Sequence, residues 1–328
     1  MPRINSHNSW SRLEECWLGD VYPVEWYEHF DSEIRDVFQQ LTEITQKDLN
    51  LIQHVIESHG VTVRRPKLTN IDLHIKNNIL QKPPIVPRDD HVVIGNTLYC
   101  LASAGPVWDY AIDQYLKDGN CKKALSPHHF IHGANVVRVG RDIIVDTDIY
   151  DIEYCNWWPE FRVQMEKNGG HMDGCFAILK PGLILANRYF DGYERTFPGW
   201  EIIYLDNPTY HAHPSRGHKQ PYPTYNGKFY DTTVGTNKTF NEHIVKHAQD
   251  WVGNYQETYF ELNCLSIDES NVIMLAENEQ LAKTLQQHGI TVHWVPFRTR
   301  SFWDGAMHCL TVDIRRQSSA EDFFPARG

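Results

Sequence analysis

Apolar residues recur at helical spacing in one long segment near the start of the chain. Between Asp31 and Ser58, isoleucine, leucine and phenylalanine return every three or four positions, as expected for one buried face of a helix. Asp31 can cap the first turn, and Gly60 can end the helix. The pattern therefore predicts a helix over 31–58 and then a strand over 61–65, which stops before Pro66.

The same order of elements returns near the other end of the chain. A helix is predicted over 281–287, His288 and Gly289 end it, and a strand is predicted over 290–295. Both segments read His-Gly, then Val or Ile, then Thr-Val. This recurrence indicates a repeated helix-turn-strand module, although such units are common enough in proteins to leave an accidental match open.

Short runs of β-branched and aromatic residues predict further strands. These cover 91–94, 142–146, 177–179, 183–186, 201–205, 261–267, 272–275 and 310–314. Tight links at 180–182 and 268–271 predict two hairpins. Single helices are predicted over 153–167, 241–252 and 277–287. Hairpins separated by single helices favour an α/β fold other than a doubly wound parallel sheet, and no linker divides residues 1–328, so we expect one domain.

The composition is that of a folded, enzyme-sized protein. Of 328 residues, 41% are hydrophobic and 22% charged, which excludes disordered and collagen-like classes. A formal net charge of −11 argues against a nucleic-acid partner. No apolar run reaches the roughly 18 residues of a membrane helix, and the N-terminus lacks an apolar signal core, so we expect a cytoplasmic protein without a membrane partner. Its seven scattered cysteines form no Cys-x-x-Cys pair and are expected to be reduced thiols.

Four segments combine residues that could do chemistry, and each alone also fits an ordinary loop. They are 87–96, 130–142, 169–174 and 304–316. In the last, Cys309 stands where a glycine-containing loop becomes an apolar strand, as an exposed nucleophile would. A thiol needs a base such as His171, and a cationic electrophile needs carboxylates. His211, His213 and His218 have ligand-like spacing but lack a nearby acid, so no metal or cofactor is expected.

Taken together, the order of these motifs resembles the glycine amidinotransferase family of guanidino-group-modifying enzymes, the pentein superfamily. The resemblance covers nearly the whole chain. Its motifs are the strand-like segment 8–19, Pro87-Arg-Asp89, Gly140-Arg-Asp142, His171-Met-Asp173 with Pro181-Gly182, and His308-Cys309 with Asp313-Ile-Arg-Arg316. The resemblance implies a five-bladed α/β propeller built from ββαβ-type modules.

By this resemblance Cys309 is the nucleophile and His171 the general acid and base, while Asp89 and Asp173 hold the guanidinium group. The implied substrates are small molecules: arginine or a similar guanidino donor, and an amine acceptor, glycine being the family's usual one. Water in place of the amine would make the protein a guanidino hydrolase instead. Dimers occur among related enzymes, and a homodimer is an open option.

Several positions depart from the family pattern. His132 stands where the family has an aspartate that orients the catalytic histidine, and Asn135 follows in the same turn, as in the inosamine-phosphate branch. Glu257 replaces a serine, and Phe190 replaces a carboxylate-binding arginine for which Arg188 is a near substitute. These departures keep three hypotheses open: an amidinotransferase, a hydrolase resembling arginine deiminase or dihydrolase, and a weakly active or non-catalytic guanidino binder.

Overall fold

The computed structural model describes most of the chain. The described residues are 4–66, 68, 82–100, 117, 121–123, 132–146, 161–166, 171–188, 192–206, 237–248, 251, 260–275, 277–303 and 305–327. Within them no helix combines the length and the apolar character needed to cross a bilayer.

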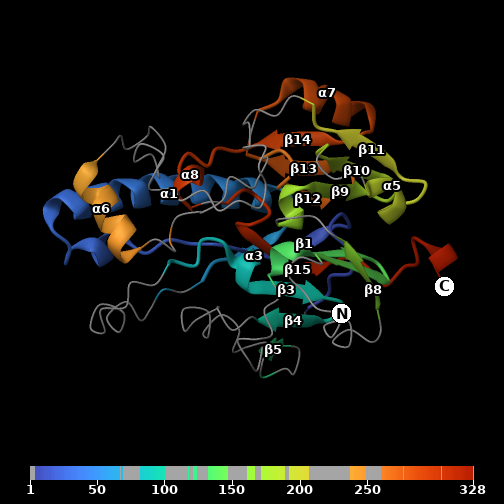
Figure 1. Ribbon diagram of the computed structural model, residues 1–328, viewed down its shortest axis with the longest axis horizontal. Coiled ribbons are helices and arrows are strands. Elements are labelled where there is room, and N and C mark those ends of the chain that lie inside the picture. Colours follow the sequence, from blue (N-terminus) through green and yellow to red (C-terminus); the bar gives the residue numbers. More distant parts are fainter. Residues whose placement is uncertain are drawn as a thin grey trace.

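The described strands form three-stranded sheets that share one topology (Figure 1). The five sheets are β3(His91–Ile94)-β4(Thr97–Cys100)-β5(Cys121–Lys123), β6(Val136–Val139)-β7(Asp142–Asp146)-β8(Arg162–Glu166), β9(Phe176–Lys180)-β10(Leu183–Ala186)-β11(Glu201–Tyr204), β12(Leu265–Asp268)-β13(Asn271–Met274)-β14(Thr291–Trp294) and β15(Thr311–Arg316)-β1(Leu13–Leu18)-β2(Thr62–Arg64). In every sheet the middle strand is antiparallel to the first strand and parallel to the third. The sheets are therefore copies of one module.

Helices occupy the same place in three of these modules, between the second and third strands. They are α1 (Ser32–Ser58), α5 (Tyr193–Thr196) and α7 (Glu279–Gln287). The two His-Gly segments end α1 and α7, and both glycines adopt positive φ angles, 79° at Gly60 and 75° at Gly289. The predicted α/β fold of repeated ββαβ modules is confirmed. The two His-Gly segments stand at equivalent positions in two of these modules.

One sheet joins the two ends of the described chain. Strand β15 is antiparallel to β1, with Cys16 opposite Asp313 and Leu18 opposite Thr311. This pairing brings the turn before β15, which contains Cys309, against the first strand of the chain. The last strand thereby completes a module that the first strand begins.

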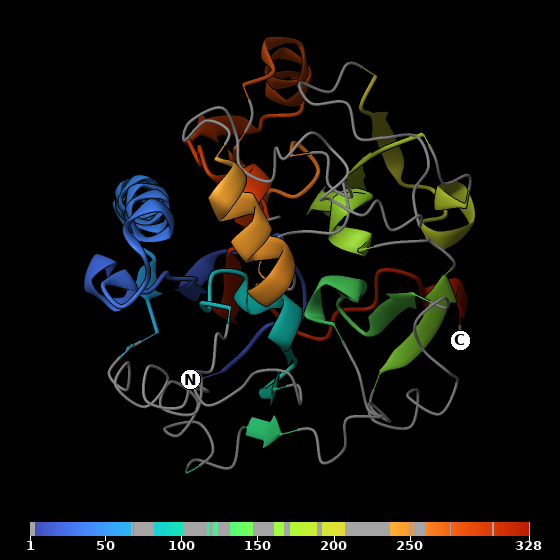
Figure 2. The same cartoon turned by 60° about the vertical axis from the view of Figure 1, so that its left-hand side comes forward.

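The remaining short elements are turns that lead into strands, and a helical layer on one side. The turns include α3 (Pro87–Asp90), η3 (Gly133–Asn135) and η5 (Met172–Gly174), and further short helices are η1 (Val24–Tyr27), α8 (Arg300–Trp303) and η8 (Pro325–Arg327). The long helix α1 and helix α6 (Lys238–His247) lie at the left of Figure 1 and stand beside each other in Figure 2. Phe38 of α1 contacts Phe240 of α6 edge to face, so aromatic packing attaches this layer.

Some predicted elements differ from the structure. The hairpins at 180–182 and 268–271 are confirmed, but the helix predicted over 153–167 is wrong where strand β8 lies. There, parallel pairing with β7 decides the conformation, as with Val163 opposite Ile143. The strand predicted over 261–267 begins only at Leu265, because Asn263 is held in a turn by its side-chain bonds to the backbone of another segment.

Four buried charged side chains, here called the central arginine cluster, connect several modules. Asp313 of β15 receives hydrogen bonds from Arg88 at 2.7 Å, from Arg138 at 2.6 Å and from Arg316 at 2.8 Å. All four side chains are at most 3% exposed. Arg88 also donates to the carbonyl of Thr311 at 2.9 Å. The cluster fixes α3 and β6 against the strand that follows Cys309.

Candidate active site

The predicted chemical residues occupy equivalent turns, one before the first strand of each sheet. Asp89 in α3 precedes β3, His132 precedes η3 and β6, and His171 and Asp173 precede β9. Cys309 precedes β15 in the same way. Helix η3 packs against both α3 and η5, so these turns meet although they are far apart in the sequence.

Asn263, in the turn before β12, supports Cys309 directly. Its Nδ2 lies 3.0 Å from the Cys309 Sγ, and its Oδ1 accepts hydrogen bonds from the backbone N–H groups of His308 and Cys309 at 2.8 and 3.0 Å. Asn263 is fully buried and Cys309 is 4% exposed. Asn263 was not predicted as a site residue. The sequence feature that could have indicated it is a single amide side chain within an apolar run.

Asp173 lies against the same sulfur. Its Oδ2 is 3.5 Å from the Cys309 Sγ and accepts a 2.8 Å hydrogen bond from His308 Nδ1. His308 is therefore a second residue that sequence reasoning missed, although it stands next to Cys309 in the motif. The bond fixes one oxygen of Asp173 and leaves Oδ1, which is buried, with no hydrogen-bond partner among the described residues.

Asp89 has a similar carboxylate oxygen. Its Oδ1 is also buried without a hydrogen-bond partner in the described part of the chain. The charges of Asp89 and Asp173 both act on Cys309, and the turn of Asp89 contacts that of Cys309, since the backbone N–H of Arg88 donates to the Cys309 carbonyl at 3.3 Å. Buried acceptors without donors are unfavourable in a folded protein, and they fit a ligand that brings N–H groups.

Burial and these two carboxylates control the protonation of the thiol. Burial, then Asp173 and then Asp89 raise the pKa of Cys309 well above its usual value, with a smaller opposing effect from Asn263. Burial by itself would raise the pKa of Asp173, but the hydrogen bond and charge of His308, with His171 and Arg88, lower it overall. Burial and Arg88 lower the pKa of His308, which is therefore neutral at pH 7 and donates to an ionised Asp173.

The two predicted histidines lie side by side. The rings of His132 and His171 have centroids 5.6 Å apart and planes inclined at 40°. Burial is the main cause that lowers the pKa of His132, and the charge of His171 adds to it while Asp89 opposes it. Asn135, predicted to bind substrate, is buried and accepts from the backbone N–H of Met172 at 3.1 Å. This bond holds the turns of the two histidines together.

One further predicted residue, Arg188, is not part of this group, and another, Glu257, is not described. Arg188 lies at the surface, with 60% of its side chain exposed, and pairs with Asp206 at 2.5 Å. Glu257 lies outside the described residues, as do Phe190 and the histidines of 211–218. Among the described residues no three His, Cys, Asp or Glu side chains are grouped to hold a metal ion.

Known proteins resemble the chain over nearly its whole length. The L-arginine:L-lysine amidinotransferase of Pseudomonas savastanoi pv. phaseolicola is 22% identical, covering 98% of this chain and 96% of the relative. The mitochondrial glycine amidinotransferase of Danio rerio is 20% identical over 98% of this chain and 85% of its own length. No family model matches the sequence.

The solved structures give the fold. An amidinotransferase of the saxitoxin biosynthetic pathway from Microseira wollei superposes with a TM-score of 0.68 at 19% identity, covering 98% of this chain and all of the other. The chain has the amidinotransferase fold. An inosamine-phosphate amidinotransferase from Streptomyces griseus gives 0.67 at 17% identity, covering 98% and 99% of the two chains. A dimethylarginine dimethylaminohydrolase gives 0.56 at 11%, covering 92% and 99%. The predicted resemblance to the amidinotransferases is confirmed.

Proposed function

We propose that the protein is an amidinotransferase that moves the amidino group of arginine, or of a similar guanidino donor, to an amine through a covalent intermediate on Cys309. One observation carries this proposal. A buried thiol lies 3.5 Å from the Asp173 carboxylate and is acted on by the charge of Asp89, and each carboxylate has a buried oxygen without a donor in the described structure. A guanidinium group presents N–H donors in one plane and a positive charge, and it would satisfy Asp89 and Asp173 together.

Binding of the donor would itself activate the thiol. The charges of Asp173 and Asp89 raise the pKa of Cys309 in the protein by itself. A guanidinium cation between them cancels that effect and adds a positive charge beside the sulfur, so the thiolate forms where its target lies. Asn263 Nδ2, at 3.0 Å, then donates to the sulfur anion.

The chemical steps assign opposite proton transfers to His171. Cys309 passes its thiol proton to His171, and the thiolate attacks the guanidino carbon. His171 then gives that proton to the departing amine as the carbon–nitrogen bond breaks. An amidino thioether remains on Cys309. His171, now neutral, takes a proton from the incoming amine, which attacks the amidino carbon and releases the thiolate. His171 stands two residues before Asp173 in the turn that leads into η5, which supports its assignment to these proton transfers.

Support for the substrates comes from the relatives' names. One relative is named for arginine and lysine, and others for glycine, so these amines are the first acceptors to examine. Glu257 remains a proposed substrate contact, whereas Arg188 is paired with Asp206 at the surface and is not expected to contact the donor.

The test is a product analysis with arginine as donor. The protein is incubated with arginine and with glycine or lysine, and ornithine, citrulline and guanidino products are measured by mass spectrometry. Ornithine together with a new guanidino compound supports amidino transfer. Citrulline as the main product would make the protein a hydrolase. Binding of arginine without either product would make it a guanidino binder.

A further inference from the structure

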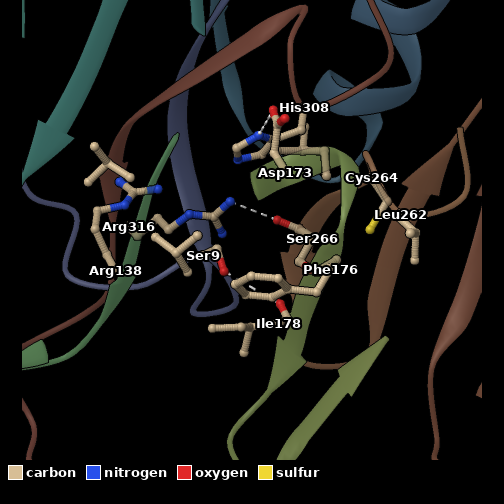
Figure 3. A pocket seen from close by; sticks show the side chains of 14 residues that line it. Ser9, Arg138, Asp173, Phe176, Ile178, Leu262, Cys264, Ser266, His308 and Arg316 are labelled. Carbon is tan, nitrogen blue, oxygen red and sulfur yellow. Dashed lines mark hydrogen bonds and ion pairs between the residues drawn. The ribbon is translucent and has the colours of Figure 1, made fainter. Parts of the chain in front are cut away.

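The arginines of the central arginine cluster lie close to the candidate active site, but they are bonded to an acidic side chain. Arg138 and Arg316 line a small cavity together with Asp173 (Figure 3). Both donate to Asp313, at 2.6 and 2.8 Å, and Arg88 donates to the same carboxylate at 2.7 Å. These buried cations are therefore committed to the fold and are not available to a carboxylate of the substrate.

Arg300, the first residue of α8, is different. Its neighbour in the same segment, Arg298, donates to Asp48 at 2.7 Å. For the guanidinium group of Arg300, the described part of the chain provides neither a hydrogen-bond acceptor nor an acidic partner. The Nε atom of Arg300 is buried, but its two Nη atoms are not. Their N–H groups thus remain accessible to a ligand that brings an acceptor.

The aromatic ring of Phe260 holds this guanidinium group. The Cζ atom of Arg300 lies over the ring, 4.8 Å from its centroid. A contact of this kind attracts the cation to the face of the ring and uses none of its N–H groups. Phe260 belongs to the turn over 260–263, which places Asn263 Nδ2 3.0 Å from the Cys309 sulfur. Arg300 is therefore attached to a turn that contacts the proposed nucleophile.

The chain between α8 and Cys309 also stays close to the nucleophile. Gly305 follows the end of α8 by two residues, and a Cβ atom at Gly305 would lie 3.6 Å from the Cβ of Cys309. The segment that carries Arg300 and the turn that carries Phe260 thus both lead directly to Cys309. Arg300 contacts Phe260 where these two segments meet, at the edge of the candidate active site.

We propose that Arg300 binds the carboxylate of the guanidino donor, an inference that rests on the proposed amidino transfer. In arginine the carboxylate is at the opposite end of the molecule from the guanidinium group that Asp89 and Asp173 would hold. Two terminal N–H groups of one guanidinium can bind both oxygens of a carboxylate. Phe190 stands at the position of the family's carboxylate-binding arginine, and Arg300 supplies the cation from another segment. The donor is accordingly a guanidino acid rather than a guanidino amine without a carboxylate.

Binding of two donors tests this assignment without requiring turnover. Arginine and agmatine, which differ only in the carboxylate, are titrated by calorimetry into the full chain carrying Cys309→Ser, which cannot form the proposed covalent intermediate. Arginine is expected to bind about 10- to 100-fold more tightly than agmatine, because a charge-assisted pair is made only with arginine. Adding Arg300→Gln should remove this difference by weakening arginine binding, while the Kd for agmatine changes by less than about threefold. Arg35→Gln, on the surface of α1, is the matched control and should preserve the difference.

The possible failures are distinguishable. An unchanged Kd for arginine in Arg300→Gln, or an equal loss of arginine and agmatine binding, would overturn the role of Arg300 and leave the proposed function intact. If neither compound binds the protein with Arg300 in place, the proposed function itself is wrong. Should Arg300→Gln not fold, Arg300→Lys decides. Lysine keeps the charge but cannot bind a carboxylate through two parallel N–H groups, so the Kd for arginine alone should rise, by about threefold or more.

Discussion

The candidate active site and the central arginine cluster are both groups of buried charged residues, but they are incomplete in opposite ways. In the cluster, three guanidinium groups share one carboxylate, and the unused groups are donors. Around Cys309 the unused groups are acceptors, the Oδ1 atoms of Asp89 and Asp173. Acceptors without donors fit a ligand that brings N–H groups, such as a guanidinium cation. The arginine cluster, whose three cations share the Asp313 carboxylate, instead connects separate modules of the fold.

The largest effect is expected from Cys309→Ser, which removes the proposed nucleophile beside the unpartnered acceptors. Turnover should fall by at least about 10⁴-fold, because a serine hydroxyl at this position has no comparable acidity. The amidinated protein seen by intact-protein mass spectrometry with arginine should disappear as well. Cys100→Ser is the matched control, since Cys100 is similarly buried but lies in strand β4 of another sheet. Retained turnover in Cys309→Ser would refute the assignment.

Asp173→Asn should separate the two effects of one carboxylate. The KM for the donor should rise roughly 10- to 100-fold, because a charge-assisted hydrogen bond is lost. The free protein should react faster with iodoacetamide at a given pH, since Asp173 raises the pKa of Cys309. Asp36→Asn, at an exposed position of α1, should change neither quantity. Slower alkylation in Asp173→Asn would contradict the electrostatic account.

His132→Asp addresses the position that departs from the family pattern. A carboxylate at this distance from His171 can stabilise its protonated form, which a neutral imidazole cannot do. We expect kcat to rise about tenfold or more. His132→Asn, which supplies no charge, is the comparison and should give no rise. A lower kcat in His132→Asp would show that His132 has a catalytic task of its own.

His308→Gln should alter the pH dependence rather than the maximum rate. When His308 gains a proton below its lowered pKa, it becomes a cation paired with Asp173 and competes with the guanidinium donor. Donor KM in the unaltered protein should therefore rise as the pH falls. Glutamine keeps a donor but cannot become charged, so this rise in donor KM should be reduced by about threefold or more in the acidic range where His308 is protonated. Identical KM profiles would count against this role.

The smallest effect is expected from Arg188→Ala. Its ion pair with Asp206 is exposed, and such pairs contribute little. Donor KM should change by less than about twofold, as in the control Arg35→Ala on α1. A tenfold increase would instead show that Arg188 leaves Asp206 to bind the substrate.

The sequence predicts best what a single segment determines. Cys309, His171, Asp173 and Asp89 were each visible in a short motif, and their turns meet in the structure. Asn263 was missed because its role depends on contact with a segment 46 residues away. Strand β8 was predicted as helix for the same reason, since its pairing with β7 is invisible in its own residues. The unpartnered oxygens of the two carboxylates likewise follow only from packing.

Pairing between β1 and β15 has a consequence for biosynthesis. Strand β1 is synthesised long before β15. Leu13 can pair with Arg316, its partner in the ladder, only after the ribosome has added the residues between them. At about 5–20 residues per second this interval lasts roughly 15–60 s. During that time one edge of β1 is open, and Cys309 has not yet been joined to the nascent polypeptide. The Cys309 thiol is therefore synthesised only after Asn263, Asp173 and Asp89, the side chains that act on it.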